Sequence, residues 1–126
     1  MVSAHPTFTL FLIEDHPLVR QVMCRILEDE PDLTVIGVAV SAEEALEQLR
    51  TLTPDLVLSD LLLPGESGAE LVSRLQKTRP GLPCVIVSAN DEPFYRTQAL
   101  DSGALEFVRK DDTDRLVEVI RQTLAT

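Results

Sequence analysis

The chain has 126 residues, a length that suits one globular domain with a hydrophobic core of its own. Its formal net charge of −10 argues against direct binding of DNA or RNA by this domain, because such binding depends on Lys and Arg contacting phosphates. No apolar run approaches the roughly 18 residues of a membrane span, and no secretory signal is visible, so we expect a cytoplasmic protein without membrane contact.

Short apolar runs alternate with segments of helical spacing along the whole chain. We predict strands near 8–13, 33–40, 56–59, 84–87 and 105–108, since each is a short apolar run bounded by turn signals. The first predicted helix ends at Pro31, and its apolar residues at helical spacing are Leu18, Val19, Val22, Met23, Ile26 and Leu27.

Capping signals mark the predicted second and third helices. Ser41 with Glu44, and Ser67 with Glu70, have the spacing of a capping box. We expect Pro54 to close the second helix and Pro80-Gly81 to break the third. Their predicted inner faces consist of Ala45, Leu46, Leu49, Leu52, Leu71, Val72 and Leu75.

The fourth and fifth helices have weaker and stronger signals, respectively. Asn90 or Asp91 is expected to cap the fourth helix, and Gly103 suits the position after its end. This helix is the least amphipathic, which makes it a candidate for mobility or partner contact, although a shallowly packed surface helix is commoner. Asp112 is expected to cap the fifth helix, whose predicted inner face is Leu116, Val117, Ile120 and Leu124.

Strict alternation of strands and helices predicts an α/β fold, with a parallel sheet covered by helices on both faces. The order of the strands cannot be read from periodicity. Cys24 and Cys84 lie inside apolar patterns, so we predict buried free thiols rather than a disulfide or a metal site.

Polar residues stand at the ends of four predicted strands: Glu14 and Asp15, Asp60, Ser88, and Lys110. In open α/β sheets, ligands bind outside the carboxyl ends of the strands. We therefore expect three acids, a hydroxyl and a lysine to meet at one edge of the sheet and to form a chemical site.

The three acids of this group predict a cation site. Glu14, Asp15 and Asp60 together carry a charge of about −3, which one lysine does not compensate. Mg²⁺ prefers one or two carboxylates with waters and phosphate oxygens, so it is the ion we expect. The alternative is that Glu14 and Asp15 only form a strand-end turn or cap the next helix.

Asp60 is the candidate nucleophile. It ends an apolar run and precedes another, which suits a carboxylate that forms an acyl phosphate. Phosphoryl transfer needs mainly positioning and charge neutralisation, and Lys110 and Ser88 can supply both. Taken singly, Ser88 also fits a residue that leads into a helix, and Lys110 fits a solvated lysine.

The chain from about residue 8 to 124 resembles the receiver domain of bacterial two-component response regulators, the CheY-like family. The matching stretches are the acidic pair within 13–17, Asp60 with Pro64 and Gly68, Ser88-Ala89, and Gly103-Ala104 before Lys110. The resemblance implies a flavodoxin-like (βα)5 three-layer sandwich with strand order 2-1-3-4-5, and residues 1–126 as a single receiver domain.

The resemblance also implies a role for each site residue. Asp60 would be the phosphoacceptor, with Lys110 and Ser88 contacting the phosphoryl group. The Mg²⁺ site would consist of Glu14, Asp15, Asp60 and the Leu62 backbone carbonyl. Ser88 and Phe107 would be the switch residues, with Phe107 acting by packing alone because it has no phenol hydroxyl.

The implied partner is a sensor histidine kinase or a histidine phosphotransfer protein. The stretch after Glu14 is most similar to the NarL-type subfamily, whose members usually carry a DNA-binding domain after the receiver. The resemblance is compatible with this domain as the N-terminal part of a longer regulator, and the sequence alone does not distinguish that from a single-domain protein. Homodimerisation through the first and fifth helices or the fourth-helix face is compatible with the sequence, but nothing in it selects either.

Two other functions compete with a signalling receiver that is not a turnover enzyme. One is an unphosphorylated pseudo-receiver that acts as an interaction module, and the intact acids argue against such decay. The other is an aspartyl-phosphate hydrolase, which would favour a second acid two residues after the nucleophile. Leu62 occupies that place.

Overall fold

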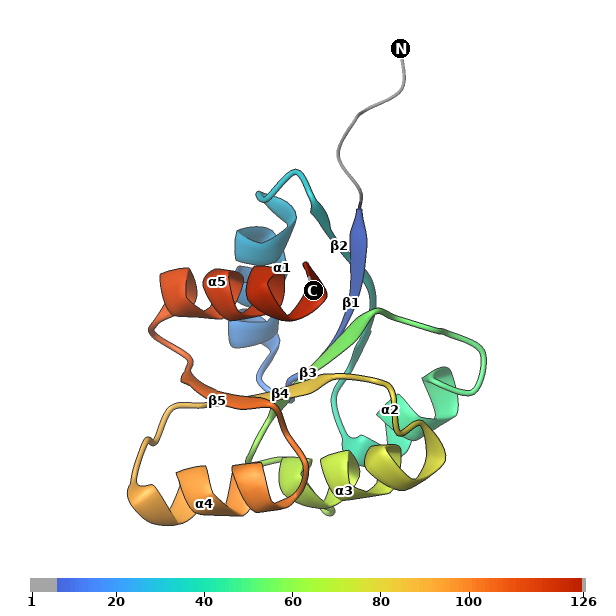
Figure 1. Cartoon of the computed structure of the whole chain (residues 1–126), viewed down its shortest axis with the longest axis vertical. Helices are drawn as coiled ribbons and strands as arrows, with labels where there is room; N and C mark the ends of the chain where they lie inside the picture. The colour runs from blue at the N-terminus through green and yellow to red at the C-terminus, as the bar shows by residue number, and fades with distance from the viewer. Residues whose placement is uncertain (1–6, 126) are drawn as a thin grey trace.

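The computed structural model describes residues 7–125, so the N-terminal segment 1–6, to which the prediction about a secretory signal refers, lies outside the described residues. Within the described residues, strands and helices alternate throughout (Figure 1). The strands are β1 (Phe8–Ile13), β2 (Leu33–Ala39), β3 (Leu56–Asp60), β4 (Cys84–Ser88) and β5 (Glu106–Arg109). The helices are α1 (Pro17–Glu28), α2 (Ala42–Gln48), α3 (Gly68–Thr78), α4 (Pro93–Asp101) and α5 (Thr113–Leu124).

The strands form one parallel sheet in the order β2-β1-β3-β4-β5. This is the flavodoxin-like order implied by the resemblance, and that prediction is confirmed. Helices α1 and α5 cover one face of the sheet, and α2, α3 and α4 cover the other (Figure 1). The chain therefore folds as a three-layer sandwich.

Successive residues of β1 enter opposite cores, as the pleat of a strand requires. Leu10 and Leu12 pack with α1 and α5, whereas Phe11 and Ile13 pack with α2, α3 and α4. Because the inner strands are buried on both faces, their sequences are continuous apolar runs. This arrangement leaves the ends of the strands as the place for polar side chains.

One of the two predicted capping boxes forms in full, and the other forms only in part. Ser67 and Glu70 form the full reciprocal capping box of α3. At α2, Ser41 Oγ accepts the Glu44 N–H at 3.1 Å, but the return bond is absent from this pair. Glu44 instead accepts a hydrogen bond from the Gln48 amide, and α2 ends at Gln48, well before Pro54.

The predicted cap of α4 is wrong. Neither Asn90 nor Asp91 is the cap, because Pro93 is the first residue of the helix and Glu92 precedes it, without a side-chain cap bond. The Asn90 Oδ1 accepts the Glu92 N–H at 3.0 Å instead, and Asp91 lies 3.3 Å from Arg109. At the other end, Gly103 adopts φ 109°, as its predicted position requires.

The inner face of α1 is narrower than its pattern predicts. Met23 and Leu27 are buried, but Leu18 and Val22 are 63% and 49% exposed. Cys24 is half-buried rather than buried, whereas Cys84 is buried, and both thiols are free. The apolar period of α1 thus predicts which side of the helix is buried, but it overstates how wide the buried face is.

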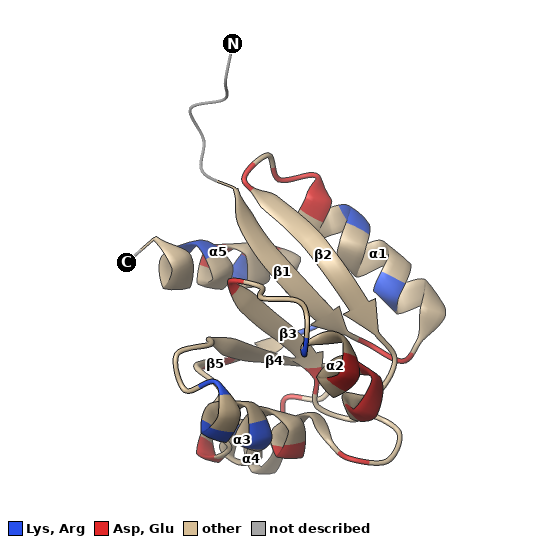
Figure 2. Cartoon of the chain, turned by 90° about the vertical axis from the view of Figure 1, so that its right-hand side faces the viewer, with Lys and Arg blue, Asp and Glu red and all other residues tan. Residues whose placement is uncertain are grey.

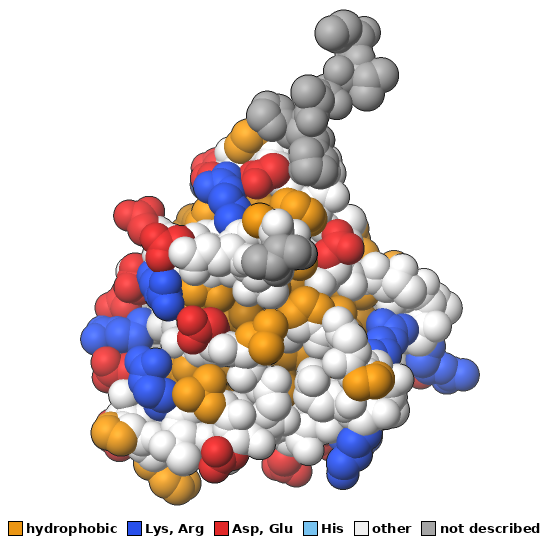
Figure 3. All heavy atoms as spheres, in the orientation of Figure 1, with side chains coloured by type: hydrophobic (Ala, Val, Ile, Leu, Met, Phe, Trp, Pro, Cys, Tyr) orange, Lys and Arg blue, Asp and Glu red, His pale blue; other side chains and the backbone are white. Residues whose placement is uncertain are grey.

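Within residues 7–125, no helix is both long enough and apolar enough to cross a membrane. Acidic residues occur on α2 and around the loop between α1 and β2, as the ribbon in Figure 2 shows. Side chains of both signs share the edge formed by β5, α4 and α5 (Figure 3). The face drawn in Figure 3 has no broad basic patch of the kind that nucleic acids require.

Candidate functional site

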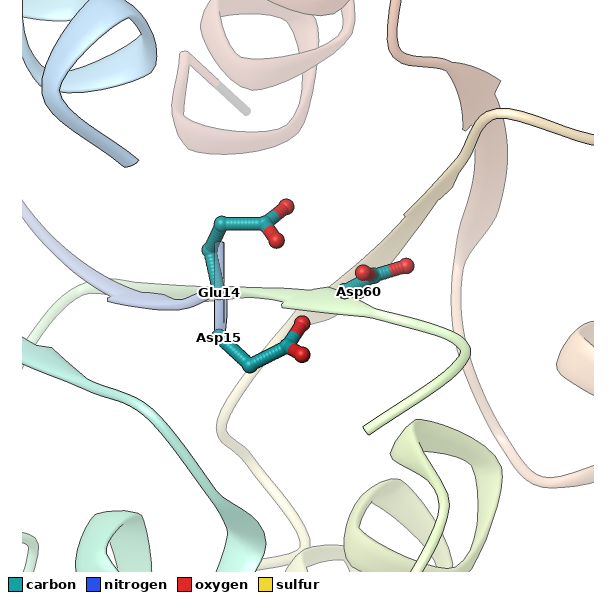
Figure 4. Close-up of side chains that lie close together, drawn as sticks. All are labelled: Glu14, Asp15 and Asp60. Carbon is teal, nitrogen blue, oxygen red and sulfur yellow. The ribbon is translucent and has the colours of Figure 1, made fainter. Parts of the chain in front are cut away.

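Four neighbouring strands deliver polar residues to one edge of the sheet. Glu14 follows β1, Asp60 ends β3, Ser88 ends β4 and Lys110 follows β5. Since these strands are parallel and adjacent in the order β1-β3-β4-β5, their carboxyl ends lie at the same edge. The side chains of Glu14 and Asp15 both lie on the side that faces Asp60 (Figure 4).

Lys110 bridges two buried carboxylates. Its Nζ lies 2.8 Å from Asp60 Oδ2 and 2.7 Å from Glu14 Oε1. Glu14 is fully buried and Asp60 is 5% exposed, whereas the Lys110 side chain retains 19% exposure. A single ammonium therefore faces two carboxylates at the carboxyl edge of the sheet.

The electrostatics of this group follow from burial. Burial raises the pKa of Asp60, the nearby Glu14 raises it further, and the ammonium of Lys110 offsets only part of the rise. Burial alone would lower the pKa of Lys110, but its hydrogen bonds to Asp60 and Glu14 outweigh this and raise that pKa. The lysine therefore stays charged at neutral pH, while the site has excess negative charge.

The loop after β1 is held by main-chain and side-chain bonds. Glu14 Oε2 accepts the His16 N–H at 3.1 Å, and Arg20 Nη1 donates to the Glu14 main-chain oxygen at 2.9 Å. Both carboxylate oxygens of Glu14 thus have close polar neighbours, since the other faces Lys110. Asp15 is exposed and lies at the mouth of the site.

The acid cluster has the donor set of a hard cation site. One carboxylate oxygen each from Glu14, Asp15 and Asp60 lies within 4.8 Å of the others. Oxygen ligands at this spacing, with an exposed side open to water, fit Mg²⁺. The Leu62 N–H donates to Asp60 Oδ1 at 3.3 Å, and the Leu62 side chain is 57% exposed.

The start of α3 packs directly on the main chain of Asp60. A Cβ added at Gly68 would lie 2.0 Å from the Asp60 carbonyl oxygen, so no larger residue fits without backbone movement. The Gly68 N–H donates to the Leu61 carbonyl at 2.8 Å. The close approach of Gly68 thus fixes the end of the loop that follows Asp60, the candidate nucleophile.

Ser88 and Phe107 lie next to this edge but are turned toward other partners. Ser88 is buried, its Oγ accepts the Asn90 N–H at 3.1 Å, and its carbonyl accepts the Lys110 N–H at 2.9 Å. Phe107 is 4% exposed, and the Arg96 guanidinium lies 4.9 Å from its ring centroid. These contacts link the loop after β4 to β5.

The structure brings together the acids and the lysine that the sequence singled out. It also adds groups that sequence reasoning missed: the His16 N–H, the Arg20 guanidinium and Arg96. Arg20 lies in the stretch after Glu14 that is similar to the NarL-type subfamily, but that resemblance assigned it no role, and a contact to a main-chain oxygen leaves no sequence pattern. A buried carboxylate can accept a phosphoryl group, a paired lysine can neutralise part of its charge, and an acid cluster can hold a cation that neutralises more.

A family model described as the response regulator receiver domain matches residues 10–121. The response regulator GacA of Pseudomonas aeruginosa is 33% identical over 117 residues, which cover 92% of this chain and 55% of GacA. The nitrate/nitrite response regulator NarL of Escherichia coli is 32% identical over 93% of this chain and 55% of NarL. The chain spans about half the length of these curated relatives.

Solved structures agree with this match. The crystal structure of a LuxR-family two-component response regulator from Aurantimonas superposes with a TM-score of 0.89 at 32% identity. The match covers 94% of this chain and 86% of that one.

Proposed function

The chain belongs to the response regulator receiver domain family, and on that premise we propose that it accepts a phosphoryl group on Asp60 in two-component signalling. The donor is a phosphohistidine on a sensor histidine kinase or a histidine phosphotransfer protein. The observation that carries the proposal is the buried Asp60 carboxylate, paired with Lys110 at 2.8 Å beside two further acids.

Asp60 Oδ1 is the oxygen we assign as nucleophile, since the long bond from Leu62 N–H is a weaker hold than the Lys110 contact on Oδ2. The new O–P bond forms as the P–N bond of phosphohistidine breaks. The departing imidazole keeps the electron pair of that bond and takes a proton from solvent. The product is an acyl phosphate on Asp60, and the domain acts as a phosphoacceptor in signalling rather than as a turnover enzyme.

Lys110 neutralises charge as transfer proceeds. In the resting state its ammonium is shared between Glu14 and Asp60, so it already lies where the phosphoryl oxygens would arrive. Glu14, Asp15, Asp60 and the Leu62 carbonyl would hold Mg²⁺. When bound, Mg²⁺ supplies the positive charge that the acids and the incoming phosphoryl oxygens lack.

The switch is proposed to run through Ser88 and Phe107. A phosphoryl group brings new acceptor oxygens, and the Ser88 hydroxyl would turn from Asn90 to donate to one of them. That turn would pull the loop after β4 inward, and Phe107 would shift under Arg96 and change the surface of α4 and β5. A comparison of amide shifts with and without a phosphoryl mimic tests this, and shifts confined to the Asp60 pocket would contradict it.

We infer that residues 1–126 form one receiver domain of a cytoplasmic regulator, with no nucleic-acid contact of its own. The relatives are about twice as long, so an output domain that binds DNA would lie outside this chain. A homodimer is compatible with the exposed faces of α1, α4 and α5.

Intact mass after incubation with acetyl phosphate and Mg²⁺ tests the proposal. The wild type should gain the mass of one phosphoryl group, and Asp60→Ala should gain none. The control is Asp91→Ala, because Asp91 is an exposed acid that pairs with Arg109 outside the acid cluster, and it should behave like the wild type. No gain in the wild type would leave an unphosphorylated interaction module as the better assignment.

A further inference from the structure

Arg20, near the start of α1, reaches back to the loop that carries the acid pair. Its Nη1 donates to the main-chain oxygen of Glu14, six residues earlier, at 2.9 Å. We propose that Arg20 is a positioning residue, which fixes this loop in the conformation that binds Mg²⁺. The inference rests on the proposed function, because it concerns the same site.

The bonded oxygen belongs to the peptide that joins Glu14 to Asp15. The Glu14 N–H donates to Ala39 at 3.0 Å, and Glu14 Oε2 accepts the His16 N–H, so the amide and the side chain of Glu14 are already fixed. The carbonyl is the remaining group of this residue, and Arg20 satisfies it. The bond therefore sets the plane of the Glu14–Asp15 peptide, and with it the direction of Asp15.

Asp15 depends on this peptide more than Glu14 does. Glu14 is fully buried, and Lys110 holds its carboxylate at 2.7 Å. Asp15 is exposed, so packing does little to hold its carboxylate, and its backbone direction decides where the side chain lies. Loss of the Arg20 bond should release Asp15 first and leave Asp60 and Lys110 in place.

The direction in which Mg²⁺ affinity changes when Arg20 is removed distinguishes a positioning role from a purely electrostatic one. A guanidinium beside the acid pair repels a divalent cation, so an arginine that acted by charge alone would weaken Mg²⁺ binding, and its removal would strengthen that binding. A positioning arginine acts in the opposite direction. Removal of a group that orients metal ligands typically weakens metal affinity about 10-fold or more.

The test is a Mg²⁺ titration of the full chain, followed through the backbone amide shift of Asp15. Arg20→Met removes both the charge and the hydrogen bonds, and we expect its half-saturating Mg²⁺ concentration to rise about 10-fold. Arg25→Met is the matched control. Arg25 is exposed in the last turn of the same helix, and its substitution removes the same charge. Its titration should match the wild type.

A second variant and a second readout protect the test from a folding defect. Arg20→Gln keeps a polar side chain that is too short to reach the Glu14 oxygen, and it should weaken binding in the same direction. At saturating Mg²⁺, phosphorylation of either variant by acetyl phosphate should approach the wild-type rate, as a positioning role requires.

Equal or tighter binding in both Arg20 variants would overturn the inference. A reduced rate that saturating Mg²⁺ does not restore would also overturn it. A wild type that binds no Mg²⁺ would instead contradict the proposed function, and the inference with it.

Discussion

Two clusters in this molecule have the same composition, one cation between two carboxylates, but lie in different surroundings. Lys110 lies between Glu14 and Asp60, where β1, β3 and β5 end. Arg121 lies between Glu30 and Asp32, which tie α5 to the segment before β2, with contacts of 2.5 and 2.8 Å. The distances are similar, so contact geometry does not separate the two.

Burial does separate them. The Lys110 side chain is 19% exposed and its partners are buried, whereas the Arg121 side chain is 43% exposed and both its partners keep contact with solvent. Water screens the second cluster, so it acts as a surface tether between α5 and the α1–β2 loop. The first cluster has charge that water cannot fully solvate, and such a site favours binding of a cation or a transferred group.

Removal of the cation should give the largest contrast between the clusters. Lys110→Met leaves two buried carboxylates without their partner, and we expect it to lower the free energy of unfolding by about 3 kcal/mol at pH 7. Arg121→Met breaks a screened network and should cost at most about 1 kcal/mol. Urea unfolding of both variants measures the difference, and equal losses would contradict the role given to burial.

The next largest effect concerns the backbone beneath Asp60. Gly68→Ala places a Cβ 2.0 Å from the Asp60 carbonyl oxygen, so α3 must shift, and we expect a loss of about 2 kcal/mol. Gly81→Ala is the control, because a Cβ there meets nothing within 4 Å, and it should be neutral or slightly stabilising. Thermal unfolding tests the pair, and an equally mild Gly68→Ala would show that the contact gives way cheaply.

Magnesium should stabilise the Asp60 cluster and leave the Arg121 cluster unchanged. At a Mg²⁺ concentration about ten times its dissociation constant, ligand binding to the folded state adds about 1.4 kcal/mol. Chelation by EDTA should remove that gain. Asp15→Asn should lose most of it, whereas Asp114→Asn, an exposed acid in the first turn of α5, should retain it. An equal Mg²⁺ response in these two variants would place the ion elsewhere.

The smallest expected effect is the pH dependence of Asp60. Its folded pKa lies above that of the unfolded chain, about 4, so its contribution to stability is complete below that pH and is lost as pH rises through the folded pKa. Asp60→Asn removes that loss. The difference in free energy of unfolding between the variant and the wild type should therefore grow, in favour of the variant, as pH rises above about 4. Urea midpoints across this range measure the advantage, and one that shrinks with rising pH would reverse the sign of the pKa shift.

The strand ends were predictable from the sequence because a strand that is buried on both faces has a continuous apolar sequence. A continuous apolar run must stop where solvent begins, so the residues that follow it, such as Asp60 and Lys110, identify the edge of the sheet. The cap of α5 was equally readable, since the Asp112 side chain accepts the Arg115 N–H as its position predicts. These features depend on local sequence alone.

Features that depend on the relative positions of elements were not predictable from pattern. The two predicted caps, Asn90 and Asp91, precede the residue before α4, because Pro93 decides where the helix begins, and Asn90 bonds the loop instead. Leu18 and Val22 follow the helical period, but no other element within residues 7–125 covers them and both are exposed. Arg20 belongs to the stretch that is similar to the NarL-type subfamily, but it bonds a main-chain oxygen, an acceptor that every residue has, so the sequence did not indicate this contact.

The central claim is that the buried acid at the end of β3, rather than the exposed acid beside it, forms the acyl phosphate. Borohydride reduction after acetyl phosphate and Mg²⁺ converts an acyl phosphate on aspartate to homoserine, which peptide mass mapping can locate. The account predicts homoserine at position 60 and at no other acid of the chain. Homoserine at position 15, or a mass gain without any at position 60, would contradict it.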